Sequence, residues 1–219
     1  MALAFSSFGY RSIKALDVSN HVRAELVNAI LQYQREDGII SPDCRDIDPD
    51  RLKEELWERF RIDLMAPCDS AHTGMEERSV DLIYSQEVFE HIAPELLPGI
   101  MQECYRLLKD DGVISFYINY ADHYFGTDKH VSRYNFLRYS EKAWKKYNPA
   151  LHYVNRLRHV DFIRLFQESG FEIVEEETFR PEGWEQMIDG FPFDKSFMEK
   201  YTREELSITS ARIVLRKKQ

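Results

Sequence analysis

Apolar residues occur along the chain in short runs that alternate with segments of helical spacing. The runs typical of strands lie at residues 13–18, 62–65, 80–85, 113–119, 171–178 and 207–216. The segments typical of helices lie at residues 21–36, 50–60, 94–109 and 154–169. In the first of these helices the helical spacing runs through Val22, Leu26, Ile30 and Tyr33. This alternation predicts an α/β fold with a doubly wound, mostly parallel sheet.

Two segments lack such periodicity. Residues 120–149 are polar and aromatic, and residues 179–201 read as a loop with several prolines and glycines. The aromatic side chains between 116 and 153 either build a second small core or line a pocket, and core packing is the expected outcome. Long loops in compact domains are usually functional or disordered, and so many aromatics argue against disorder. We therefore expect a single domain spanning residues 1–219, with 120–149 as a lid or acceptor-binding insertion.

The bulk composition excludes several classes of protein. The formal net charge of −9 over 219 residues does not indicate a basic nucleic-acid face. The longest apolar runs are strand-sized, so no transmembrane helix is expected, and residues 1–5 are a poor secretion signal. Cys44, Cys68 and Cys104 lie far apart, which predicts reduced thiols in the cytoplasm and argues against a zinc site or disulfides. Composition does not fix the oligomeric state.

The most informative stretch is a strand–helix–strand unit. Residues 79–92 read as a buried strand that runs into a turn, and residues 107–116 read as a helix end, a glycine turn and the next buried strand. In open parallel sheets ligands bind outside the carboxyl ends of the strands. Ser85, Gln86 and Glu87 are expected there.

This unit resembles the fourth strand, the following helix and the fifth strand of class I S-adenosylmethionine-dependent methyltransferases. The typical sequence motifs of this family are FDLIxSxxVLEHI followed by LKPGGxLxI. In this chain, Lys109-Asp110-Asp111-Gly112 stands in place of Lys-Pro-Gly-Gly. The resemblance covers roughly residues 13–216. It implies a Rossmann-like methyltransferase fold with an antiparallel C-terminal hairpin, and S-adenosylmethionine as the cofactor.

The resemblance also implies which residues bind that cofactor. Asp17, at the end of a strand, would accept hydrogen bonds from the ribose hydroxyls, although it could instead cap the following helix. Asp69 would receive the adenine amino group, or it is a loop acid of an acidic protein. Ser85 and Gln86 would lie beside the methionine portion of the cofactor, whose sulfonium needs polar oxygens nearby, or they serve the turn alone.

Candidate groups for the acceptor follow the next strand. Asp122 and His123 form a neighbouring pair that could deprotonate a hydroxyl or an amine, or the pair caps a loop. His91 could act as a base, but its frequency in the family fits a pocket wall better. These readings make Asp122 and His123 the predicted catalytic residues.

Two segments of the chain resemble a narrower subgroup of these methyltransferases in sequence. Residues 132–140 and 153–158 resemble methyltransferases often associated with bacterial surface-glycan pathways. Arg138, Arg156 and Arg158 could hold a phosphate or carboxylate of a sugar substrate, but ion pairs with the many acids are the favoured interpretation. The expected acceptor is therefore a small molecule or a glycan.

Two absences in the sequence shape the prediction. The family begins with a strand that ends in a Gly-x-Gly-x-Gly turn, and here Gly9 is the only glycine before Gly38. We expect the first strand and this turn to be missing, through a late start, a truncation, a remodelled N-terminus or loss of the cofactor. His123, Asp128 and His130 match no metal-ligand motif, so no metal is expected.

Two functions remain in competition. The first is methyl transfer from S-adenosylmethionine to a small or glycan-type acceptor. The second is a methyltransferase-like chain that has lost cofactor binding and acts as a binding or scaffold protein, which the missing glycine turn favours. A Rossmann-type oxidoreductase is disfavoured because no dinucleotide glycine fingerprint is present.

Overall fold

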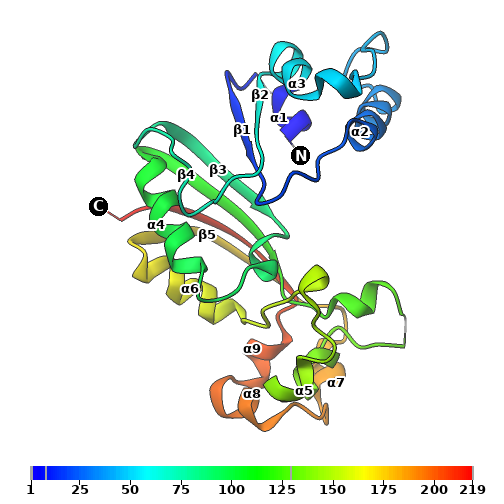
Figure 1. Cartoon of the computed structure of the whole chain (residues 1–219). Helices are drawn as coiled ribbons and strands as arrows, with labels where there is room; N and C mark the ends of the chain where they lie inside the picture. The colour runs from blue at the N-terminus through cyan, green and yellow to red at the C-terminus, as the bar shows by residue number, and fades with distance from the viewer. Residues whose placement is uncertain (1, 8, 129, 219) are drawn as a thin grey trace. The chain divides into compact units, whose positions relative to one another are not determined.

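The computed structural model describes residues 2–7, 9–128 and 130–218. The chain divides into two compact units, Met1–Thr73 and Gly74–Gln219, and each is described by itself (Figure 1). The expected single domain over residues 1–219 therefore stays a prediction.

The first unit is built on two short parallel strands. β1 (Ile13–Leu16) pairs with β2 (Ile62–Met65) so that Ile13 lies opposite Ile62. The helices of this unit are α1 (Ala2–Ser7), α2 (Ala24–Glu36), the 3-10 helix η1 (Pro49–Arg51) and α3 (Leu52–Phe60). The apolar side chains that these elements bury together are Leu3, Val27, Leu31, Ile47, Leu56, Ile62 and Leu64.

The helix α2 forms where the sequence predicts it, but with a different buried face. It buries Val27 and Leu31, whereas Leu26, Ile30 and Tyr33 are exposed. The two apolar stripes lie next to each other on the helix, so spacing alone could not decide which of them faces the strands. The turn before α3 is capped by Asp48, whose side chain accepts the backbone N–H of Asp50 at 3.0 Å.

The second unit contains a four-stranded sheet in the order β3-β4-β6-β5. The strands are β3 (Val80–Gln86), β4 (Leu108–Asn119), β5 (Phe171–Phe179) and β6 (Ser210–Lys217). β3 and β4 are parallel neighbours joined through α4 (Leu97–Leu107), while β6 runs antiparallel to both β4 and β5. The predicted parallel pair and the C-terminal hairpin are both confirmed.

Two helices pack against this sheet. α4 contributes Leu97 and Met101 to the main core, and α6 (His159–Glu168) contributes Phe162 and Phe166 (Figure 1). Phe116 of β4 meets these side chains from the sheet and is 1% exposed. The apolar runs of the sequence therefore become the interior of this unit.

The segment expected to form a glycine turn lies inside β4 instead. Between the pairs Val80–Leu108 and Leu82–Val113 the strand register shifts, so that residues 109–112 bulge from the ladder. A Cβ atom on Gly112 would lie 2.8 Å from Cδ1 of Leu108 and 3.1 Å from the carbonyl oxygen of Asp81. Glycine is required here by close approach of neighbouring atoms.

The two non-periodic segments build a second small core. Residues 120–149 contain the 3-10 helices η3 (His123–Gly126) and η4 (Asn135–Arg138) and the helix α5 (Glu141–Trp144), and η5 (Ala150–His152) follows. Residues 179–201 are not only a loop. With the residues that follow they form three short helices, α7 (Trp184–Ile188), α8 (Lys195–Lys200) and α9 (Arg203–Ser207).

The side chains of this core come from both segments and confirm core packing for many of the aromatics. Its buried members are Tyr134, Phe136, Leu137, Trp144, Val154, Ile188, Phe197, Tyr201 and Leu206. Helices of five or six residues are too short to display a helical period, so the sequence pattern did not reveal them.

Two buried arginines hold backbone segments around the small core. The guanidinium of Arg158 donates to the carbonyl oxygens of Tyr120 at 2.8 Å and Ile208 at 2.6 Å. Arg156 donates to the carbonyl oxygens of Phe136 and Tyr139. Burial lowers the pKa of Arg158 to about 10. Arg156 also forms the expected ion pair with Glu141 at 2.6 Å, whereas the Arg158 guanidinium binds backbone carbonyls instead.

Candidate functional site

The carboxyl end of β3 lies where the sequence predicts it. Ser85 is half-buried opposite Phe116, and Gln86 is exposed and accepts a hydrogen bond from the Tyr84 hydroxyl at 2.7 Å. Glu87 then reverses the chain with a φ of 53°, a left-handed conformation that is uncommon outside glycine. Strained backbone of this kind often lies at binding sites. Ser85 and Gln86 thus lie at the sheet edge where ligands bind in parallel α/β folds.

The turn after β3 places a carboxylate in an apolar setting. η2 (Phe89–His91) is anchored by Phe89, which packs on Phe116 with ring centroids 4.3 Å apart. The next side chain, Glu90, is 2% exposed, and its Oε1 accepts the backbone N–H of Asn119 at 3.3 Å. Burial raises the pKa of Glu90 to about 7.

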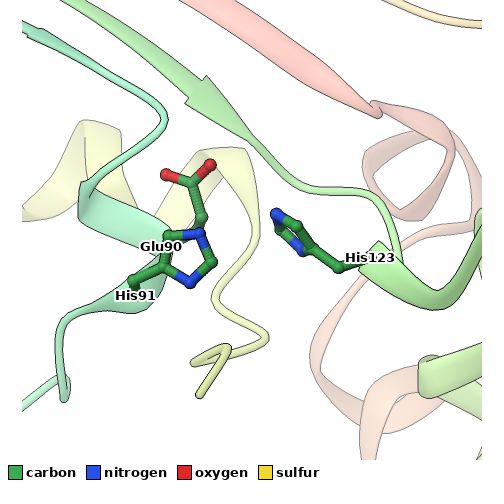
Figure 2. A group of neighbouring side chains, drawn as sticks. All are labelled: Glu90, His91 and His123. Atoms are coloured by element: carbon green, nitrogen blue, oxygen red, sulfur yellow. The ribbon is translucent and has the colours of Figure 1, made fainter. Parts of the chain in front are cut away.

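Two histidines meet beside this carboxylate. His91 belongs to η2, and His123 opens η3 in the segment after β4, yet their ring centroids are 4.8 Å apart (Figure 2). Nδ1 of His91 donates to the carbonyl oxygen of Tyr153 at 2.7 Å. Burial lowers the pKa of His123, and the nearby His91 lowers it further. A neutral His123 imidazole is suited to accept a proton near pH 7.

Asp122 does not pair with its neighbour in the chain. Its Oδ1 accepts the backbone N–H of Tyr124 at 2.8 Å, and its Oδ2 accepts the side-chain amide of Asn135 at 3.1 Å. It is 2% exposed, and burial raises its pKa. This is the capping arrangement that was the alternative to catalysis, while His123 turns toward His91. A direct catalytic role for Asp122 stays a prediction.

The two predicted nucleoside-binding acids follow β1 and β2 of the first unit. Asp17 is half-buried, and its Oδ1 accepts the N–H of Ser19 at 2.8 Å and the Ser19 hydroxyl at 3.0 Å. The N–H of Cys68 donates to the carbonyl oxygen of Asp17 at 2.8 Å, so the loops after the two strands lie side by side.

The second acid, Asp69, is exposed on the loop after β2. Its oxygens contact the N–H of Ala71 at 2.9 Å and Nδ1 of His72 at 3.0 Å. The hydrogen bond from His72, and then that from Ala71, lowers the pKa of Asp69. Both acids are held by local turns, and their roles toward a cofactor stay predictions.

The feature that the sequence analysis missed is the cluster of Glu90 with the two histidines. The sequence predicts a pocket wall at His91 and no separate role for Glu90. The available signal was the acid–imidazole pair directly after a strand whose partner strand is followed by His123. Parallel pairing of β3 and β4 brings these groups to one edge.

Every helix in the described part of the chain is too short or too polar to cross a lipid bilayer.

Comparison with protein families gives a match over part of the chain. Residues 40–116 match the family model described as a methyltransferase domain. The matched stretch runs from the first unit into β4 and contains Asp69, Ser85, Gln86 and the Glu90–His91 turn. No curated protein matches the chain.

Solved structures share the fold at low sequence identity. A protein from Methanosarcina mazei, described as a SAM-dependent methyltransferase, superposes with a TM-score of 0.55 at 13% identity, over 100% of this chain and 87% of that chain. Geranyl diphosphate C-methyltransferase from Streptomyces coelicolor, solved with Mg²⁺, geranyl diphosphate and S-adenosyl-L-homocysteine, gives 0.53 at 14% identity, over 97% and 67% of the two chains. The chain therefore has the Rossmann-like methyltransferase fold.

Residues 40–116 thus match a methyltransferase domain, and the solved structures that share the fold include S-adenosylmethionine-dependent methyltransferases.

Proposed function

We propose that this protein transfers a methyl group from S-adenosylmethionine to a small-molecule or glycan-type acceptor. The observation that carries the proposal is the position of Ser85 and Gln86 at the carboxyl end of β3, inside the stretch that matches a methyltransferase domain. Fold alone does not fix function, so the proposal depends on these residues and on the cluster beside them.

Each predicted residue has a defined task in this proposal. Asp17 accepts hydrogen bonds from the ribose hydroxyls, and Asp69 accepts one from the adenine amino group. Ser85 and Gln86 offer their side-chain oxygens to the methionine portion of the cofactor. These assignments rest on the resemblance to the family.

The chemistry is a direct displacement. A lone pair on an acceptor oxygen or nitrogen forms a bond to the methyl carbon, the carbon–sulfur bond breaks, and sulfur keeps the electron pair. The acceptor proton passes to His123, whose lowered pKa keeps the ring neutral and able to receive it. Positioning of the two reactants contributes most of the rate.

The segment 120–149 is assigned to the acceptor. It leaves the sheet at the carboxyl end of β4, carries His123 at its base and packs its aromatic side chains into the small core. We infer that it forms a wall of the acceptor site. The guanidinium groups of Arg156 and Arg158 donate hydrogen bonds to backbone carbonyl oxygens. Arg138 is exposed, so of the three arginines it is the one that can bind an anionic acceptor.

Cofactor affinity tests the assignments on the first unit. In a version extended upstream by a strand that ends in a Gly-x-Gly-x-Gly turn, Asp17→Ala should weaken S-adenosylhomocysteine binding at least tenfold in calorimetry. Asp63→Ala is the matched control, because Asp63 lies on β2 and forms an exposed ion pair with Lys14. Equal affinities of the two variants would remove the ribose role of Asp17.

A further inference from the structure

Glu90, His91 and His123 form a cluster with the composition of a metal site. Each offers one ligand atom, and these three atoms lie within 4.8 Å of one another (Figure 2). We propose that the cluster binds a divalent transition-metal ion of the zinc class. This goes beyond the proposed function and does not depend on it, and it replaces the expectation from sequence that no metal binds.

The carboxylate of Glu90 supplies the first argument. Its Oε1 accepts the N–H of Asn119, but its Oε2 is buried and has no hydrogen-bond partner among the described residues. A buried polar atom without a partner is costly, and a bound cation is one of the few groups that satisfy it. Oε2 is therefore an oxygen that the protein fold holds ready for a ligand.

The ring of His91 is held in the tautomer that a metal needs. A carbonyl oxygen only accepts hydrogen bonds, so the 2.7 Å contact with Tyr153 fixes the proton on Nδ1 of His91. The lone pair then lies on Nε2. Metal-ligating histidines usually donate their other ring N–H to a carboxylate or a backbone carbonyl in this way.

The third ligand, His123, comes from a different element. Figure 2 shows its ring reaching from the segment after β4 toward the η2 turn that carries Glu90 and His91. Ligand atoms around a tetrahedral ion lie about 3.4 Å apart. Both histidines are partly exposed, so small side-chain rotations can close the cluster around an ion.

The ligand set favours a particular class of ion. Two imidazoles and one carboxylate suit zinc, cobalt or nickel, whereas magnesium and calcium prefer oxygen ligands alone. Three protein ligands also leave a position open for water or for an oxygen of another molecule, as in catalytic zinc sites. A metal-bound imidazole takes no proton, so ion binding and the base role of His123 exclude one another.

The test uses the 219-residue chain after treatment with a chelator that is then removed. Titration with Co²⁺ should give visible absorption bands of a tetrahedral or five-coordinate ion, and calorimetry with Zn²⁺ should give one ion per chain with a micromolar or tighter dissociation constant. His91→Ala, His123→Ala and Glu90→Gln should each weaken Zn²⁺ binding at least tenfold. Glu90→Gln keeps an oxygen for the Asn119 N–H, so it preserves the local fold.

His130→Ala is the matched control. His130 is an exposed histidine of the same insertion and lies outside the cluster, so its removal should leave Zn²⁺ affinity unchanged. Circular dichroism in the presence of chelator checks that each variant is folded. Absence of Co²⁺ bands together with no Zn²⁺ binding below about 100 μM, or equal affinities of the His91, His123 and His130 variants, would overturn the proposal.

Discussion

The imidazole rings of His91 and His123 lie 4.8 Å apart, centroid to centroid, although they follow different strands. Their meeting depends on the parallel pairing of β3 and β4, which places both carboxyl ends at one edge of the sheet. Glu90, buried beside them, has its pKa raised to about 7. Groups with perturbed pKa values gathered at such an edge are candidates for function.

Removal of the His123 imidazole should lower the rate of methyl transfer without changing the affinity for S-adenosylmethionine. In a version extended upstream by the glycine-turn strand and assayed with chelator, His123→Ala should lower turnover at least tenfold, because the acceptor proton loses its base. S-adenosylmethionine affinity should remain nearly unchanged. His130→Ala, which removes an exposed histidine of the same segment, should keep full turnover. Full turnover in the His123 variant would remove the assigned base.

Protein stability should depend on the ionisation of Glu90. The pKa of its carboxyl rises from 4.5 in the unfolded chain to about 7 in the folded protein, so between these values the folded state binds more protons. The free energy of unfolding should therefore fall as pH rises from 4.5 to 7, by on the order of 3 kcal/mol.

Glu90→Gln isolates this effect, because glutamine resembles the protonated acid and does not titrate. The stability of the variant relative to the parent should increase with pH over the same window, in urea unfolding measured with chelator. If the difference in free energy of unfolding between variant and parent does not change between pH 4.5 and 7, Glu90 ionises as readily in the folded protein as in the unfolded chain.

Arg158 should be a major determinant of stability. Arg158→Ala removes the donors to the buried carbonyls of Tyr120 and Ile208, and each unsatisfied carbonyl costs about 1–3 kcal/mol. The free energy of unfolding should fall by about 3 kcal/mol or more. Arg138→Ala, at an exposed position of η4, should change it by less than about 0.5 kcal/mol. Similar values for the two variants would show that the buried guanidinium does not hold these segments together.

Much of the fold could be predicted because the strands are apolar runs bounded by turns. β2 has the predicted ends, and the β3–β4 pair follows from the strand–helix–strand order. The pattern failed where it was ambiguous or too short. α2 carries two apolar stripes, and the helices of residues 184–207 are shorter than two turns.

The candidate site was predictable only in part. Ser85 and Gln86 end a strand that the sequence marks clearly, so their place could be predicted. The burial of Glu90 could not, because it depends on Phe89 packing against Phe116 and on the backbone of Asn119 from the neighbouring strand. Likewise, the sequence could not show that both carboxylate oxygens of Asp122 accept hydrogen bonds, from the Tyr124 N–H and the Asn135 side-chain amide.

The most direct test is calorimetry with S-adenosylmethionine on two versions of the protein. The 219-residue chain contains no Gly-x-Gly-x-Gly turn, whose backbone contacts no side chain can replace, so it should bind weakly or not at all. The version extended by a strand and this turn should bind with a micromolar dissociation constant. Failure of the extended version to bind would contradict the methyltransferase account and favour a scaffold role, and micromolar binding by the 219-residue chain would contradict the role given to the glycine turn.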